Sequence, residues 1–154
     1  MEMAEIRTRH LFTLRLRVSG MQAIGATPIG DRRIGLVEGG TFQGERLRGT
    51  VLPGGADWII ARPDGAMALD VRLALQTEDG ALIGLTYRGL RHGPKEVMDR
   101  MARGEAVDPT QYYFRTVGGF ETAAPRYDWL NRVWAVGTGE RPPEGPVYEL
   151  FEVL

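Results

Sequence analysis

Hydrophobic and polar side chains alternate along several short stretches of this chain. The clearest stretch begins at residue 10 and has one face of Phe12, Leu14, Leu16 and Val18 and another of Thr13, Arg15 and Arg17. A period of two over nine residues predicts a half-buried strand of an antiparallel sheet, ended by Ser19 and Gly20. Shorter stretches bounded by glycine and proline predict further strands at 33–38, 46–52, 57–62, 112–117, 127–137 and 147–153.

The longest predicted strand spans residues 66–77. One of its faces carries Met67, Leu69, Val71, Leu73 and Leu75, and the other carries Asp70 and Arg72. The sequence Glu78-Asp79-Gly80 is typical of a tight turn. Residues 81–88 then return as a second strand with Tyr87 and Arg88 on opposite faces, so the pattern predicts a β-hairpin.

One short helix is expected near residues 94–103. Pro94 suits the first position of a helix, and Gly104 suits the position just after its end. Glu96 and Arg100 have the spacing of an i,i+4 ion pair. With about nine strands and one helix, the chain is predicted to be all-β, a single antiparallel β-barrel domain over residues 1–154.

A glycine-rich segment at residues 39–58 is the most distinctive part of the chain. It reads GGTFQGERLRGTVLPGGADW, and its two Gly-Gly pairs predict tight turns on either side of a strand. Together with Leu69-Asp70-Val71-Arg72, Tyr113-Phe114-Arg115-Thr116 and Trp129-Leu130-Asn131, it resembles the signature series of the family called domain of unknown function 3237. The resemblance implies a lipocalin-like or streptavidin-like β-barrel, and it implies no particular activity.

The composition argues against several classes of partner. The net charge is −1 and the isoelectric point is near 6.1, so the protein has no field that favours nucleic acid or an anionic membrane. No apolar run approaches the roughly twenty residues of a membrane helix, and the N-terminus lacks the apolar core of a secretory signal. We therefore expect a cytoplasmic protein with neither a nucleic-acid partner nor a membrane partner.

The scarcity of common catalytic residues narrows the chemistry further. The chain has no cysteine, and its only serine and only lysine, Ser19 and Lys95, stand outside any nucleophile motif. The two histidines, His10 and His92, form no metal-ligand spacing, so no metal site is predicted. No phosphate-binding glycine motif is present, and no cofactor is predicted. Acids, arginines and aromatic side chains remain as the candidates.

The candidate site is drawn from those three residue types. Asp57 and Asp70 are the candidate catalytic residues, as metal-independent acid–base groups whose pKa would be raised by burial. Such a site suits an anionic or aromatic small molecule, with proton transfer of the isomerase, cyclase or hydratase type on an organic acid, a ketone or an aromatic metabolite. The candidate ligand-binding residues are Trp58, Arg72, Tyr87, Arg115, Glu121, Trp129 and Asn131.

This hypothesis depends on which face of residues 66–77 points into the barrel. The alternation alone favours a solvated Asp70 and Arg72, whereas the polar signature words of the family resemblance favour the inward orientation, which we adopt as the expectation. Structural ion pairs of Asp70 with Arg72 and of Arg115 with Glu121 are an alternative. The alternative functions are a non-catalytic carrier and a homo-oligomer, such as a homodimer, in which residues 147–153 pair between subunits.

Overall fold

The computed structural model describes residues 2–154, and nine strands account for most of them. The strands are β1 (Thr8–Thr27), β2 (Gly30–Gln43), β3 (Arg48–Val51), β4 (Gly55–Ala61), β5 (Met67–Thr77), β6 (Leu82–His92), β7 (Tyr113–Glu121), β8 (Trp134–Glu140) and β9 (Val147–Val153). The helical segments are α1 (Lys95–Ala102) and two 3-10 segments, η1 (Pro109–Gln111) and η2 (Pro125–Arg132). No helix in this described part has the length and apolar character that crossing a membrane requires.

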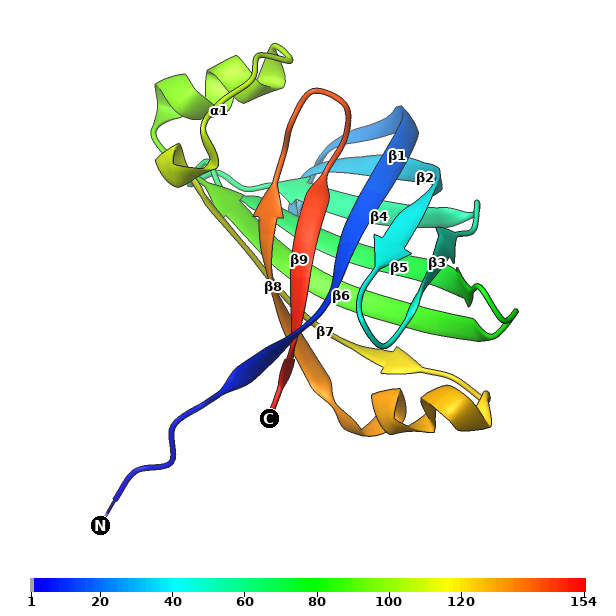
Figure 1. Ribbon diagram of the computed structural model, residues 1–154. Helices are drawn as coiled ribbons and strands as arrows, with labels where there is room; N and C mark the ends of the chain where they lie inside the picture. The colour runs from blue at the N-terminus through cyan, green and yellow to red at the C-terminus, as the bar shows by residue number, and fades with distance from the viewer. Residues whose placement is uncertain (1) are drawn as a thin grey trace.

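The pairing of the strands closes the sheet into a barrel (Figure 1). β1 pairs with β2 on one side and with β9 on the other, and the order continues through β8, β7, β6 and β5. Two short strands, β3 and β4, complete the ring between β5 and β2. β4 pairs with the first half of β5, β3 pairs with the end of β5, and both pair with β2 on their other side. The predicted all-β antiparallel barrel is therefore confirmed, and the predicted β5–β6 hairpin is present.

The alternation along β5 decides which side chains fill the barrel. Leu69, Val71, Leu73 and Leu75 are all buried in the core, whereas Asp70 is half-buried and Arg72 is exposed on the outer surface. The expectation that this charged face points into the barrel is wrong. Burial of an aliphatic side chain stabilises the fold by about 1.5–3 kcal/mol, and an unpaired charge inside would oppose folding. The apolar face therefore takes the interior.

The first Gly-Gly pair, Gly39-Gly40, lies within a strand rather than in a turn. β2 runs without interruption through both glycines, and Gly40 pairs with Leu16 of β1 and Val51 of β3. Gly40 has a φ of 153°, and a Cβ added there would lie 2.0 Å from the carbonyl oxygen of Arg15. The glycine therefore serves close backbone approach, which is its other common use. β1 likewise continues beyond Ser19 and Gly20, because a β-bulge there absorbs the irregularity.

The predicted strand at residues 127–137 divides into η2 and β8. Pro125 stands in the first turn of η2, where its missing N–H costs nothing. The side chain of Asn131 accepts a hydrogen bond from the Thr122 N–H at 2.8 Å and donates one to the Thr122 carbonyl at 2.9 Å. These two hydrogen bonds hold η2 against the end of β7. The strand prediction is wrong here because it ignored the proline.

The helix α1 lies close to its predicted position. Its i,i+4 ion pair joins Lys95 to Asp99 at 2.7 Å, instead of the expected Glu96 and Arg100. Val97 is its one buried residue, so the helix packs on the barrel through a narrow apolar strip.

The last strand, β9, is enclosed within the sheet. It pairs with β1 along one side and with β8 along the other. The idea that residues 147–153 pair between subunits is therefore wrong, because their hydrogen-bonding edges are occupied within the chain. Association through another surface stays a prediction.

Candidate functional site

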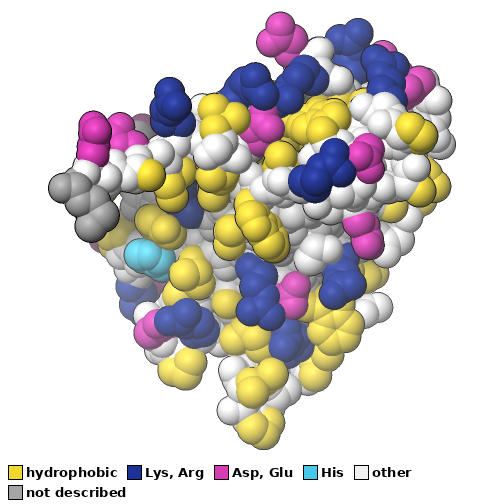
Figure 2. Space-filling view, turned by 90° about the horizontal axis from the view of Figure 1, so that it is seen from below, with side chains coloured by type: hydrophobic (Ala, Val, Ile, Leu, Met, Phe, Trp, Pro, Cys, Tyr) yellow, Lys and Arg dark blue, Asp and Glu magenta, His cyan; other side chains and the backbone are white. Residues whose placement is uncertain are grey.

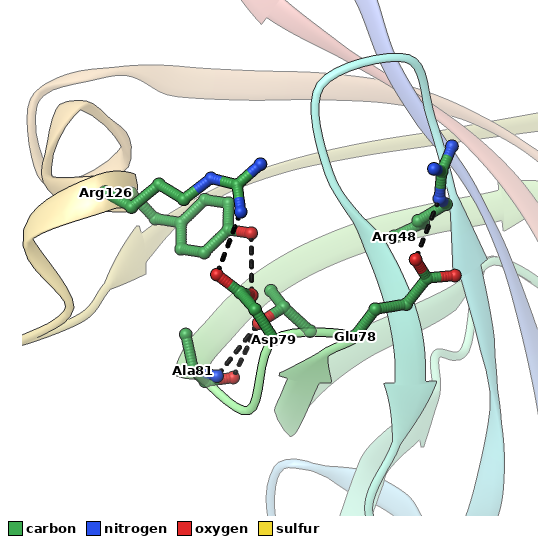
Figure 3. A network of polar contacts seen from close by, with 7 residues as sticks. Arg48, Glu78, Asp79, Ala81 and Arg126 are labelled. Carbon is green, nitrogen blue, oxygen red and sulfur yellow. Dashed lines mark hydrogen bonds and ion pairs between the residues drawn. The ribbon is translucent and has the colours of Figure 1, made fainter.

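The barrel has two different ends. We call the end that carries η2 and the β5–β6 turn the closed end, and the end that carries α1 and the β8–β9 loop the open end (Figure 1). At the closed end, Asp79 accepts hydrogen bonds from Thr77, from Tyr127 at 2.9 Å and from Arg126 at 3.0 Å (Figure 3). The bond from Thr77 and then that from Tyr127 hold the pKa of Asp79 below its ordinary value.

A second acid is paired at the same end. Glu152 is only 4% exposed and contacts Arg9 at 2.6 Å and Arg46. Burial alone would raise the pKa of Glu152, but the hydrogen bonds from both arginines outweigh burial and lower it. The guanidinium of Arg46 also lies 4.4 Å from the ring centre of Trp129. Viewed from below, acidic and basic side chains are interspersed over the surface (Figure 2), which fits a structural rather than a ligand-binding role.

The open end contains a cavity of about 450 Å³. This volume lies in the range of about 300–1,000 Å³ that small-molecule sites occupy. α1 contributes Met98 and Met101 to one wall, and β5 contributes Met67 and Leu69 to another. The charged side chains that line this cavity are Arg33, Asp57, Arg91, Glu105 and Arg141.

Asp57 is the acid on the inner wall of this cavity. It pairs with Val71 in the sheet and so shares the inward face of that residue. One of its carboxylate oxygens accepts a hydrogen bond from the backbone N–H of Asp70 at 3.1 Å. Burial raises the pKa of Asp57 from 3.8 to about 7, although the Asp70 N–H and the charge of Arg91 partly oppose the increase. Asp57 can therefore hold or release a proton near neutral pH.

Arg91 lies on the inward face of β6 and, like Asp57, is half-buried. Burial lowers its pKa, and its Nε has no hydrogen-bond partner among residues 2–154. The guanidinium lies 5.5 Å from the ring centre of Phe114. No carboxylate of the described residues lies within ion-pair distance, 4.0 Å, of Arg91. Its charge is therefore not neutralised by a direct partner.

Two tyrosines lie beside this pair of charges. The rings of Tyr87 and Tyr148 are 5.2 Å apart, and burial raises the pKa of both phenols, so both stay protonated at neutral pH. Tyr148 lines the cavity, whereas the Tyr87 hydroxyl lies deeper. Each phenol affects the pKa of the other, but the two hydroxyl groups form no hydrogen bond. The Tyr87 hydroxyl has no hydrogen-bond partner within the described chain.

The sequence-predicted site residues are dispersed around the barrel. Trp58, Asp70 and Arg115 line an outer groove of about 820 Å³ on the sheet surface. Arg72 and Glu121 line a neighbouring shallow hollow on the same surface.

The remaining predicted residues lie elsewhere. Asp57 and Tyr87 point into the barrel, while Trp129 and Asn131 belong to the closed end. Although the outer groove is larger, its acid, Asp70, lies on the outer face of the sheet, whereas Asp57 lies on the inward face, so we take the smaller cavity as the candidate site. Asp57 is thus the one predicted catalytic residue that lines it.

Five polar residues of the cavity were missed by the sequence analysis. Arg91 was within reach, because the inward series of Ile83, Leu85 and Tyr87 continues through Gly89 to position 91. Tyr148 was also within reach, since it alternates with Leu150 in β9. Arg33 alternates with Gly35 and the buried Val37 in β2, so it too was within reach. Glu105 and Arg141 lie outside the strands, where no alternation places a side chain.

The arrangement can bind a small molecule and move a proton. An acid with a pKa near neutrality, an arginine and a neutral phenol line one partly enclosed space that also has apolar methionine walls. No cluster of three or more histidine or acidic side chains that could hold a metal ion occurs among residues 2–154. The groups that could act on a ligand are therefore Asp57, Arg91 and Tyr148.

Comparisons with known proteins give a family without an assigned activity. The family profile described as protein of unknown function (DUF3237) matches residues 6–153. A UPF0311 protein of Rhodopseudomonas palustris is 38% identical over 149 residues, which cover 97% of each chain. The crystal structure of that organism's conserved protein of unknown function is similar to this one with a TM-score of 0.94 at 38% identity, covering 99% of this chain and 100% of that one.

Two further solved structures share the fold. A protein of Acinetobacter baumannii described as beta-barrel like has a TM-score of 0.86 and 37% identity, with 99% of each chain covered. A protein of Penicillium herquei described as an enzyme has a TM-score of 0.76 over 100% of this chain and 98% of its own. At 23% identity, that last similarity establishes a common fold and nothing more.

Proposed function

The chain belongs to the DUF3237 family of proteins of unknown function, and on that premise we propose that it binds a small organic molecule in the open-end cavity and transfers a proton with Asp57. The observation that carries this proposal is the inward-facing carboxyl of Asp57, whose pKa burial raises to about 7. General acid–base catalysis is most effective when the pKa of the group lies near the working pH.

The proposed chemistry uses three side chains in distinct roles. Asp57 removes a proton from the ligand and returns it at another atom, as in an isomerisation, a cyclisation or the addition of a hydroxyl group. The neutral phenol of Tyr148 donates a hydrogen bond to a ligand oxygen that gains negative charge. Arg91 supplies positive charge to the same side of the cavity. The description of a distant fold relative as an enzyme is compatible with this proposal and does not identify its reaction.

Exchange of ligand protons with solvent tests the proposal directly. Small ketones and 2-oxo acids are incubated with the protein in D2O, and proton NMR follows the loss of signal next to each carbonyl. We expect the wild-type protein to accelerate exchange for at least one compound and Asp57→Asn to lose about 100-fold or more of that rate. Asp70→Asn is the matched control, because its side chain lies on the outer surface beside the same strands, and it should retain the rate.

Two outcomes separate the proposal from a carrier function. If Asp57→Asn exchanges protons as fast as the wild-type protein, Asp57 is not the base. If the wild-type protein binds these compounds and accelerates no exchange, the cavity serves transport or storage. The expected rate rises with pH through about 7, because the charged carboxylate is the proton acceptor.

A further inference from the structure

Arg91 is the unusual charge of the open-end cavity. A buried cation without a partner opposes folding, and natural proteins usually pair such groups or keep them in water. Arg91 instead lies half-buried against Phe114, with a buried Nε that finds no acceptor among residues 2–154. The side chain is therefore available to a ligand.

The other arginines of the cavity already contact acceptors. Arg33 forms an ion pair with Asp31 at 3.1 Å, and Arg141 donates a hydrogen bond to the carbonyl of Pro142 at 2.7 Å. The remaining acid of the lining, Glu105, contacts Arg103 at 2.8 Å. Arg91 is thus the cavity arginine whose Nε finds no acceptor in the described chain, and the charge of Arg141, which contacts only an uncharged carbonyl here, acts on it from nearby.

The shape and surroundings of that guanidinium select the kind of anion. A guanidinium fork matches the two oxygens of a planar carboxylate. The same cavity also has apolar walls, formed by Met67, Leu69, Met98 and Met101. A phosphate ion directs oxygens to all sides and has no apolar part to contact these walls. A carboxylate attached to an apolar body fits both the charge and the walls.

We infer that Arg91 anchors the carboxylate of the ligand and that the ligand is a small monocarboxylic acid with an apolar body. This inference rests on the proposed function, because it assigns a ligand class to the same cavity. It also explains the methionines of α1, whose flexible side chains adapt to apolar ligands of different shape. In this arrangement the carboxylate fixes one end of the ligand, and Asp57 faces the body.

The test compares acids with their neutral amides. Isothermal titration calorimetry at pH 6.5 measures the binding of two acids, hexanoate and cyclohexanecarboxylate, and of their amides, hexanamide and cyclohexanecarboxamide. The proteins compared are the wild type, Arg91→Leu, Arg91→Lys and Arg88→Leu. We expect wild type to bind the acids at least 10-fold more tightly than the amides. Arg91→Leu should bind the acids about 30-fold more weakly than wild type and no better than the amides. The affinity of Arg91→Lys for the acids should lie between those of the wild type and Arg91→Leu, because lysine keeps the positive charge and lacks the forked guanidinium geometry.

Arg88→Leu is the matched control, because Arg88 lies on the outer face of the same strand, and it should bind as the wild type does. The inference is overturned if Arg91→Leu binds the acids unchanged, if the amides bind wild type as well as the acids, or if no acid binds at millimolar concentration. It is also overturned if inorganic phosphate displaces the acids more effectively than they displace each other. Thermal melts of each variant show whether the change has unfolded the protein.

The two proposals fail in different ways. If the acids bind through Arg91 and the wild-type protein exchanges no ligand proton, the carboxylate anchor stands and the catalytic proposal falls. If proton exchange depends on Asp57 while Arg91→Leu binds the acids normally, the catalytic proposal stands and the anchor falls.

Discussion

The two ends of the barrel use the same residue types in opposite ways. At the closed end, Asp79 and Glu152 receive hydrogen bonds from arginines, and their pKa values are lowered. At the open end, Asp57 and Arg91 are half-buried without a direct charged partner within the described chain. Burial raises the pKa of Asp57 and lowers that of Arg91. The paired charges fasten η2 to the barrel, whereas the unpaired charges oppose folding and remain free to meet a ligand.

This difference explains why charged residues alone do not reveal a site. Paired acids and arginines satisfy one another, and a ligand would have to break those contacts before binding. Half-buried groups without a partner have lost part of their hydration, so a complementary ligand group adds an interaction at a smaller further desolvation cost. The effect of a substitution at one end can therefore be compared with that of a substitution at the other end or on the outer surface.

The largest expected effect is that of Asp57→Asn on stability. The pKa of Asp57 is 3.8 when unfolded and about 7 when folded, so the folded protein holds a proton that the unfolded chain has released. This costs stability progressively as the pH rises from about 4 to about 7, and the loss stays constant above that. Asparagine keeps the acceptor for the Asp70 N–H and has no charge to bury. We expect Asp57→Asn to be more stable than wild type at pH 8 by about 4 kcal/mol.

Urea unfolding at pH 4, 6 and 8 measures that difference. At pH 4 the gain should shrink to about 0.5 kcal/mol, because the folded protein is then almost fully protonated at this residue and the unfolded chain is only about 60% ionised. Asp70→Asn is the surface reference and should show little dependence on pH. An Asp57→Asn variant that is less stable than wild type at pH 8 would contradict the buried, unpaired carboxyl.

The closed end should respond in the opposite direction. Glu152→Gln removes the charge that joins Arg9 and Arg46, and we expect a loss of about 2–3 kcal/mol, less than for a fully buried pair because both arginines are partly exposed. Chemical unfolding at pH 7 measures the loss. Glu140→Gln, an exposed substitution on β8, should leave the free energy of unfolding unchanged. Equal effects of the two substitutions would mean that the contacts of Glu152 do not stabilise the fold.

Two arginine-to-leucine changes compare the ends most directly. Arg46→Leu loses both the Glu152 contact and the packing on Trp129, so we expect a loss of about 1–2 kcal/mol. Arg91→Leu removes a buried charge without a direct partner, so we expect stability to be unchanged or to rise by about 1 kcal/mol. Thermal melts of the two variants in one buffer measure both. A larger loss for Arg91→Leu than for Arg46→Leu would show that Arg91 has a partner of structural importance.

The smallest effects come from removing single hydroxyl groups. Tyr127→Phe deletes a hydrogen bond of 2.9 Å to Asp79, and we expect a loss of about 1 kcal/mol. Tyr87→Phe deletes a buried hydroxyl that has no partner in the described structure, and we expect no loss or a slight gain. Denaturant unfolding of both variants tests this contrast. A clear destabilisation by Tyr87→Phe would indicate that a bound water or ligand completes its hydrogen bonding.

The sequence by itself determined the all-β class, the β5–β6 hairpin and the inner face of the barrel. Alternation with a period of two is a local property, so the burial of Leu69 to Leu75 and the hairpin of β5 and β6 followed from it. The same alternation favoured an outward orientation of Asp70 and Arg72. The inward orientation was expected because the motifs shared with the family are polar, and this expectation was wrong. The turn at Gly54 was also readable, whereas the continuation of β2 through Gly40 depended on how closely β1 approaches.

Only the tertiary structure decided which charges stay unpaired. Asp57 and Arg91 come from β4 and β6, which β5 separates in the sheet, and their surroundings also include β9, α1 and the β8–β9 loop. A pKa depends on how much water and how many charges the whole fold leaves around a group. No local pattern encodes that sum, because the contributing atoms come from distant parts of the chain and meet only when the barrel closes.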